Sequence, residues 1–143
     1  MALEIKIKYF NPEMPKIEKL EIGDWVDLRA AETVQLTAGT HVMIPLGVAM
    51  KLPPGFEAII VPRSSSFKKW GVLQTNGVGV VDESYCGDED QWWWTVWCTR
   101  DAPIEAFDRI CQFRIQQKQP NLIFIETQTL GKSRGGFGST GTK

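Results

Sequence analysis

The sequence predicts an all-β protein, a sandwich or a barrel, on the strength of two observations. Short runs rich in β-branched and aromatic residues recur along the chain, and Pro or Gly residues separate them, as in Pro53-Pro54-Gly55. Several of these runs alternate polar and apolar residues, which is typical of a strand with one buried face. With 143 residues, 43% of them hydrophobic, the chain is long enough for one globular core, and we expect one folded domain.

The alternating run at residues 3–9 is the first predicted strand. Further strands are expected at residues 42–46, 48–52, 56–61, 78–81, 92–98, 109–116 and 122–126. The one predicted helix is short, at residues 64–70, where serines after Pro62 can cap a turn or two. From Gly131 onward small residues dominate, so the sequence predicts a folded domain over residues 1–130 and a mobile C-terminal arm over residues 131–143.

The run at residues 91–99 has tryptophans on both faces of the predicted strand. Trp92 and Trp94 point to one side and Trp93 and Trp97 to the other. A strand with one solvated face would not expose indoles, so we expect the second face to pack against a neighbouring subunit. A wide tryptophan-lined core within one chain is the alternative.

Composition limits the class of protein. The net charge is −1, so the chain has no overall positive field for a nucleic acid, and we expect none as a partner. No signal-peptide or membrane-spanning run is present, so a soluble protein without membrane contact is expected. Cys86, Cys98 and Cys111 form no CxxC pair, and their odd number fits a reducing cytoplasm.

Four internal segments carry groups suited to chemistry, each with a structural alternative. The segment at residues 61–66 offers the Arg63 guanidinium and serine hydroxyls to an anion, or forms a capped turn. The segment at residues 75–88 predicts a glycine-rich hairpin that ends at Asp82, a candidate general base or a turn-capping residue. The segments at residues 23–31 and 108–112 are, taken alone, typical of a turn and an amphipathic strand.

The arm suits a nucleotide better than its composition first suggests. Its glycines allow backbone amides to converge on one anion, and Phe137 can stack on a base. Arg134 can form a bidentate contact with phosphate oxygens. A flexible solubilising tail is the alternative.

Together, five segments in order resemble the motifs of the trimeric dUTPase family: VDLRAA, PRSS, GVGVVDESYCGD, RICQ and RGGFGSTG. The resemblance extends from Asp27 to Gly141. It implies a distorted jelly-roll-like barrel and a homotrimer whose three active sites are shared between subunits. It also implies Mg²⁺ on the triphosphate and hydrolysis of dUTP to dUMP and pyrophosphate.

The resemblance further implies roles for single residues. Asp82 would orient and deprotonate the attacking water, and Tyr85 would pack under the deoxyribose and exclude a 2′-hydroxyl. Asn76, with the backbone around Gly79 and Val80, would bind the uracil edge. In this family a second Asp is common at the position that Ser84 occupies here.

Other residues would bind the triphosphate and its metal. Arg63 and Ser64, with Ser65 beside them, would hold the α and β phosphates, and Gln112 would contact phosphate or the waters of the metal. Asp27 would bind Mg²⁺ through water, which suits an ion that keeps much of its hydration shell.

The arm would close last, with Phe137 over the uracil and Arg134 or Lys132 on the γ phosphate. We favour Arg134, because only a guanidinium offers a planar fork. The arm residues expected to bind substrate are Arg134, Phe137, Gly138, Ser139 and Thr140.

Two other functions remain open at this point. The same fold serves dCTP deaminases, in which a glutamate base drives loss of ammonia. A nucleotide-dependent regulator that binds a partner protein is the second alternative.

Overall fold

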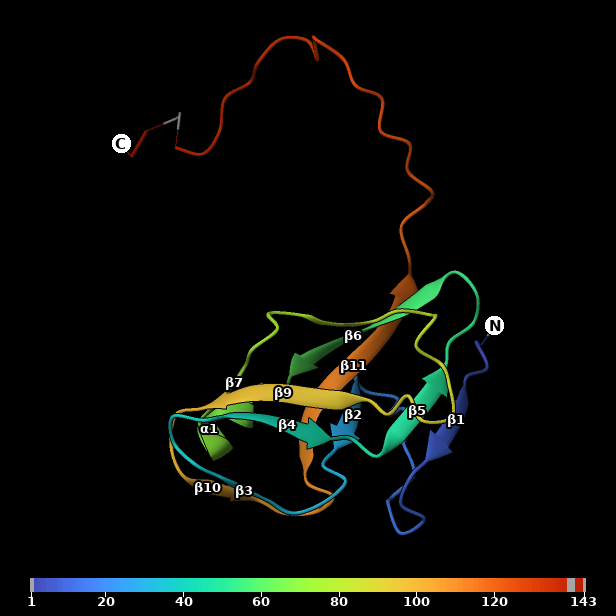
Figure 1. The fold of residues 1–143 in the computed structure, drawn as a ribbon, viewed down its shortest axis with the longest axis vertical. Coiled ribbons are helices and arrows are strands. Elements are labelled where there is room, and N and C mark those ends of the chain that lie inside the picture. The colour runs from blue at the N-terminus through green and yellow to red at the C-terminus, as the bar shows by residue number, and fades with distance from the viewer. Residues whose placement is uncertain (1, 139–140, 143) are drawn as a thin grey trace.

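The computed structural model describes residues 2–138 and 141–142 (Figure 1). Within them it contains one short helix and is otherwise built of strands, so the all-β prediction is confirmed. The elements are β1 (Lys6–Tyr9), β2 (Val26–Arg29), β3 (Val34–Leu36), β4 (His41–Pro45), β5 (Val48–Lys51), β6 (Phe56–Pro62), α1 (Ser66–Trp70), β7 (Val72–Gln74), β8 (Gly79–Val81), β9 (Trp93–Cys98), β10 (Ala102–Ile104) and β11 (Arg109–Gln117).

Antiparallel pairing arranges these strands in four sheets around one core. The largest sheet has the order β2-β11-β6-β8, and a second has the order β4-β9-β7. Two further pairs, β1-β5 and β10-β3, complete the barrel. Apolar residues from both larger sheets meet in the interior, where the rings of Trp92 and Phe113 pack edge to face with centroids 5.4 Å apart.

Four short strands were not predicted from the sequence. β2, β3, β7 and β10 have only three or four residues each, too few for a clear alternation of polar and apolar positions. β7 and β8 also form no hairpin with each other, because β7 pairs with β9 while β8 pairs with β6. The connection between them therefore passes from one sheet to the other.

The strand predicted at residues 122–126 is absent. The segment is extended but exposed, with Ile123 at 87%, Phe124 at 90% and Ile125 at 83% exposure. Its sequence suits a strand, yet among the described residues no strand lies beside it to complete a hydrogen-bonded ladder.

The two faces of β9 differ as expected. Trp94, Val96 and Cys98 are buried, whereas Trp93 and Trp97 are 41% and 43% exposed. On that outer face the ladder places Leu73 opposite Trp97, and Leu73 is itself exposed. The alternative of a wide tryptophan core within one chain is therefore wrong for Trp93 and Trp97. A neighbouring subunit against this face stays a prediction.

Candidate active site

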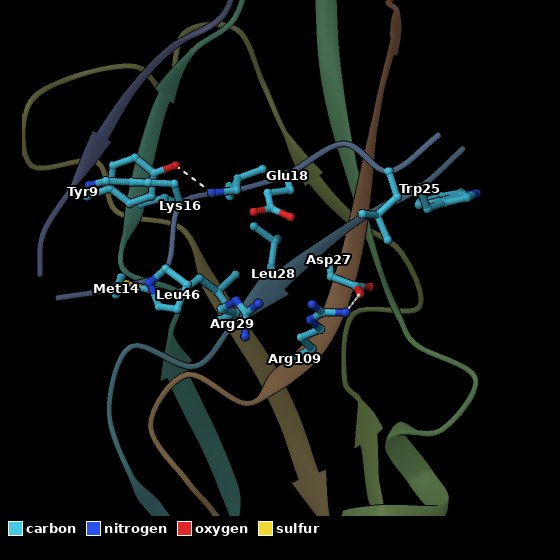
Figure 2. Close-up of a pocket in the computed structure, with 14 residues that line it drawn as sticks. Tyr9, Met14, Lys16, Glu18, Trp25, Asp27, Leu28, Arg29, Leu46 and Arg109 are labelled. Atoms are coloured by element: carbon cyan, nitrogen blue, oxygen red, sulfur yellow. Dashed lines mark hydrogen bonds and ion pairs between the residues drawn. The ribbon is translucent and has the colours of Figure 1, made fainter. Parts of the chain in front are cut away.

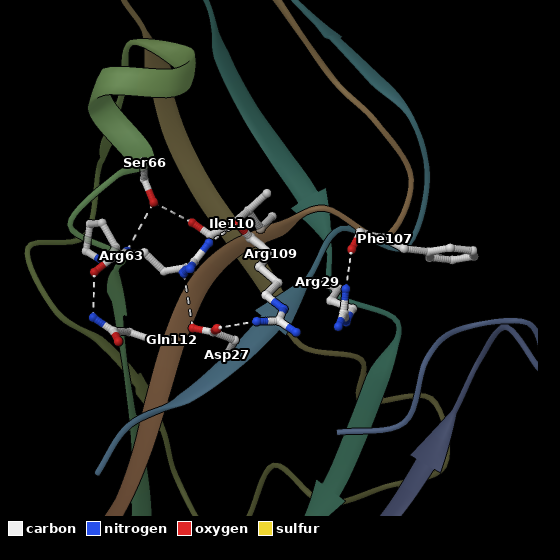
Figure 3. A network of polar contacts seen from close by, with 9 residues as sticks. Asp27, Arg29, Arg63, Ser66, Phe107, Arg109, Ile110 and Gln112 are labelled. Atoms are coloured by element: carbon white, nitrogen blue, oxygen red, sulfur yellow. Dashed lines mark hydrogen bonds and ion pairs between the residues drawn. The ribbon is translucent and has the colours of Figure 1, made fainter. Parts of the chain in front are cut away.

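Three strands of the largest sheet bring together a cluster of charged and polar side chains. β11 lies between β2 and β6, and Gln112 on β11 is the direct cross-strand partner of Asp27 on β2. Arg63 directly follows β6, and its Nε lies 3.1 Å from Asp27 Oδ1. Arg109 Nη1 lies 3.7 Å from the other carboxylate oxygen of Asp27 (Figure 3). We call Asp27, Arg63, Arg109 and Gln112 the arginine cluster.

Hydrogen bonds to β11 and to Ser66 fix the position of Arg63. Its Nη1 donates to the carbonyl oxygen of Arg109 at 3.0 Å, and its backbone N–H donates to Ser66 Oγ at 3.0 Å. Ser66 is fully buried, and its hydroxyl donates to the carbonyl oxygen of Ile110 at 2.7 Å. The expected capping of the helix by serine side chains is therefore wrong. Ser65 is the N-cap without a side-chain cap bond, and the Ser66 hydroxyl ties α1 to β11 instead.

The remaining predicted phosphate ligands lie beside the cluster. Gln112 Nε2 donates to the carbonyl oxygen of Pro62 at 3.0 Å, and Ser64 is exposed at the start of α1 with Ser65 half-buried after it. An open hollow of about 350 Å³ borders the cluster and is lined by Arg29, Arg63, Lys69, Trp70, Phe107, Asp108 and Arg109. This lining contains four cationic side chains and one carboxylate. Its net positive charge suits the binding of an oxyanion.

A smaller cavity of about 50 Å³ lies between the N-terminal segment and β2 (Figure 2). Met14, Lys16 and Glu18 line it from the N-terminal side, and Asp27 and Arg109 lie at its border with the arginine cluster. The backbone N–H of Ile17 donates to the Tyr9 hydroxyl at 2.9 Å, and this bond anchors the N-terminal segment beside the cavity.

Asp82 lies in a tight turn at the end of β8. Its Oδ2 accepts hydrogen bonds from the backbone N–H of Ser84, at 2.9 Å, and from the Ser84 hydroxyl. Its carbonyl oxygen accepts from the backbone N–H of Tyr85 at 3.0 Å. The hydroxyl bond from Ser84, followed by the backbone bond, lowers the pKa of Asp82, so the side chain is a carboxylate at neutral pH. We call residues 82–85 the Asp82 turn.

The other residues expected to bind the nucleoside lie next to this turn. Tyr85 is 39% exposed and its hydroxyl donates to the carbonyl oxygen of Gln91 at 2.7 Å. Asn76 and Val80 are exposed, and Gly79 lies so close to β6 that a Cβ would be 3.3 Å from Ile60 Cβ. The glycine thus lets β8 pack tightly against its neighbour.

Within one chain the Asp82 turn and the arginine cluster are far apart. Val81 pairs with Ala58 near the start of β6, whereas Arg63 follows the end of β6. Asp82 is therefore level with residue 57, six residues before Arg63, and a strand rise of about 3.3 Å per residue separates them by roughly 20 Å.

The arm is separate from both groups. It leaves the barrel after β11 and extends away from it, at the red end of the chain in Figure 1. Arg134, Phe137 and Gly138 are exposed, and Phe137 has no burial at all. Ser139 and Thr140, which the sequence also assigned to substrate, lie outside the described residues.

The sequence assigned no role to Arg109 of the arginine cluster or to Ser66, which holds Arg63 in place. Arg109 is the first residue of the RICQ segment, and its place in that segment was the usable signal; its contact with Asp27 is visible only in the structure. Ser66 could not be singled out from its two serine neighbours. No group of three or more His, Cys, Asp or Glu that could hold a metal occurs in the described part of the chain.

Comparisons with known proteins agree on one family. A family model described as dUTPase matches residues 26–141. The SPbeta prophage-derived deoxyuridine 5'-triphosphate nucleotidohydrolase YosS of Bacillus subtilis is 54% identical over 142 residues, which cover 99% of this chain and 100% of that protein. A deoxyuridine 5'-triphosphate nucleotidohydrolase of Streptomyces avermitilis is 33% identical, covering 97% of this chain and 81% of its own.

Solved structures show the same fold. A mutant dUTPase of Staphylococcus bacteriophage 80alpha with dUpNHpp superimposes with a TM-score of 0.79 at 19% identity, covering 99% of this chain and 100% of its own. A mutant dUTPase from phage phi11 of S. aureus, described with a structural Mg(II) ion, has a TM-score of 0.75 at 17% identity, with coverage of 88% and 99%.

Proposed function

The chain belongs to the dUTPase family, and on this basis we propose that it hydrolyses dUTP to dUMP and pyrophosphate. The relative with 54% identity over its whole length is a deoxyuridine 5'-triphosphate nucleotidohydrolase, and this match supports the activity most directly. The geometry adds an ionised carboxylate in the Asp82 turn and a positive cluster for phosphates, which hydrolysis of a nucleoside triphosphate requires.

The proposed chemistry is one in-line displacement. The Asp82 carboxylate accepts a proton from water as the water oxygen attacks the α phosphorus. The bond from that phosphorus to the bridging oxygen breaks, and pyrophosphate leaves with the bonding electron pair. Tyr85 packs against the deoxyribose, and Asn76 with the backbone of Gly79 and Val80 selects uracil.

The arginine cluster holds the phosphates in this proposal. Arg63, Ser64 and Gln112 contact the α and β phosphates, with Ser65 next to them, and Arg63 neutralises charge on the leaving pyrophosphate. Asp27 provides one carboxylate for a hydrated Mg²⁺, which fits an ion that is usually bound by one or two carboxylates plus substrate phosphates. Bound there, Mg²⁺ would supply further positive charge to the phosphoryl oxygens.

The observation that carries the shared-site proposal is the separation of roughly 20 Å between the Asp82 turn and the arginine cluster. Reacting groups must lie within about 3.5 Å of the substrate atoms they act on, so one chain cannot complete the site. We therefore propose a homotrimer in which one subunit provides the arginine cluster and another the Asp82 turn.

Two exposed apolar surfaces support assembly. The outer face of β9 carries Trp93 and Trp97, and residues 122–126 have a strand-forming sequence that pairs with no strand in the part of the chain that the structure describes. We propose that both pack against neighbouring subunits. The arm would then reach a neighbour's site, with Phe137, Gly138 and Arg134 over the bound nucleotide.

The proposal also places the protein in the cytoplasm and favours hydrolysis over deamination. All three cysteines are free, which fits a reducing cytoplasm, and no helix in the described residues is long and apolar enough to cross a membrane. The relatives are named for dUTP hydrolysis and not for deamination. Binding of a regulatory protein partner would add to catalysis and would not replace it.

The test is to supply each common nucleoside triphosphate with Mg²⁺ and to measure pyrophosphate and ammonia separately. We expect pyrophosphate from dUTP alone and no ammonia from dCTP. Ammonia from dCTP without pyrophosphate from dUTP would assign the chain to the deaminase activity.

Light scattering at micromolar concentration should give a particle three times the 16.1 kDa chain mass.

A further inference from the structure

Glu83, the residue after Asp82, contacts two other parts of the barrel. Its Oε2 accepts the backbone N–H of Gly55 at 2.8 Å, and its Oε1 forms an ion pair with Lys118 Nζ. The backbone N–H of Lys118 in turn donates to the carbonyl oxygen of Gly55 at 3.0 Å. Gly55 has a φ of +87°, which favours glycine in the turn that precedes β6.

These contacts cross the start of β6 from one side to the other. Val81 at the end of β8 pairs with Ala58, and Gln117 at the end of β11 pairs with Phe56 on the opposite edge of β6. The Glu83–Lys118 pair therefore joins the Asp82 turn to the point where the chain leaves β11 toward the arm.

We propose that the Glu83–Lys118 ion pair is a positioning device for catalysis, which fixes the Asp82 turn on the sheet and sets the charge around its carboxylate. This inference rests on the proposed role of Asp82 as the base. It assigns functions to two residues outside the substrate contacts, and neither of them touches the nucleotide in the proposed site.

The charges near Asp82 give this pair an effect that a purely structural contact lacks. Hydrogen bonds from Ser84 lower the pKa of Asp82 most, and the positive charge of Lys118 lowers it further. Glu83, Asp82 and Glu57 are the acidic groups that face Lys118, and each raises the pKa of Lys118. Glu83 thus cancels part of the field that Lys118 exerts on Asp82.

The side chains of this pair are partly exposed, 42% for Lys118 and 26% for Glu83. Solvent screens such a pair, and its contribution to folding stability is small. Variants that break it should therefore remain folded and assembled, so that their catalytic behaviour can be measured.

Two single variants break the same ion pair but leave opposite charges behind. Lys118→Met leaves the Glu83 carboxylate beside Asp82, so the pKa of Asp82 should rise by a few tenths of a pH unit. Glu83→Gln leaves the Lys118 cation, so the pKa of Asp82 should fall by a similar amount. The double variant should lie between them, close to the original chain.

The measurements are the ¹³C-carboxyl titration of Asp82 in the full-length protein and the pH dependence of kcat with dUTP and Mg²⁺. We expect the acid limb of the kcat–pH profile to follow the Asp82 titration in each variant. Near neutral pH, kcat should fall about twofold to fivefold in both single variants with KM unchanged, because the Asp82 turn is less firmly held. Glu89→Gln is the matched control, because Glu89 is exposed and pairs with Lys8 only at 3.9 Å. It should alter neither readout.

Shifts of the Asp82 titration in the same direction in both single variants, or in neither, would overturn the inference. Equal shifts in the Glu89→Gln control would do so as well. Failure of the proposed function would have another signature. If Asp82→Asn kept its turnover, Asp82 would not be the base. The carboxyl titration of the original protein and the ion-pair variants would still report whether the ion pair affects the pKa of Asp82.

Discussion

Mixing two inactive variants should restore activity if the active site is shared between subunits. Asp82→Asn removes the proposed base, and loss of a general base typically lowers the rate by about 10²–10⁴-fold. Arg63→Ala removes the main phosphate-binding guanidinium of the arginine cluster. Each variant alone should therefore be nearly inactive, while each retains the group that the other lacks.

The expected recovery follows from the geometry. The two groups lie roughly 20 Å apart in one chain, so each site takes its Asp82 from one subunit and its Arg63 from another. In a random equimolar mixture, half of the subunits carry each intact group, and about one quarter of the sites receive both in a closed ring of like interfaces.

The assay is pyrophosphate release from dUTP after the two variants are co-expressed with different tags and mixed oligomers are isolated. Each isolated mixed trimer has one site of three that receives both groups, so we expect about one third of the original kcat per site, with KM near that of the original protein. A mixture of Arg63→Ala with Asp27→Ala is the matched control, because both changes damage the arginine cluster and no site escapes both. Activity that stayed at the level of the separate variants in verified mixed oligomers would refute the shared site.

Three further predictions concern the Asp82 turn and the arm. Ser84→Ala removes the hydroxyl bond that lowers the pKa of Asp82 most. A carboxylate with a depressed pKa loses its charge only as the pH falls through that pKa, so the variant should lose kcat at a higher pH than the original protein. An unmoved acid limb of the kcat–pH profile would contradict the role of Ser84. Tyr85→Ala should narrow the preference for dUTP over UTP, measured as the ratio of kcat/KM, whereas an unchanged ratio would place sugar selection elsewhere. A chain ending at Leu130 should keep its thermal unfolding midpoint and its oligomer mass but lose most of its kcat, because the exposed arm adds no burial to the barrel; full activity would make the arm a passive tail.

Local sequence patterns were sufficient to predict the fold class. Alternation of polar and apolar residues along single strands is a local property, so runs such as 56–61 and 109–116 predicted β6 and β11 nearly to their ends. The resemblance to the dUTPase family implied that Asp27, Arg63 and Gln112 serve one triphosphate, and the structure places these three residues side by side.

Pairing between distant strands decided the rest. Residues 122–126 have the sequence of a strand, but no strand among the described residues pairs with them, and pairing depends on a second segment that a local pattern does not contain. The same holds for Ser66, whose hydroxyl bonds the carbonyl oxygen of Ile110 because α1 packs against β11.

The separation of the Asp82 turn from the arginine cluster is the clearest case. The sequence determined which residues we propose as the base and as the phosphate and nucleoside ligands, because the motifs that carry them are local. Only the tertiary structure decided where they lie, because β8 pairs with the start of β6 and Arg63 follows its end. That register sets a distance of roughly 20 Å along one strand, a quantity fixed by backbone hydrogen bonding between segments far apart in the chain.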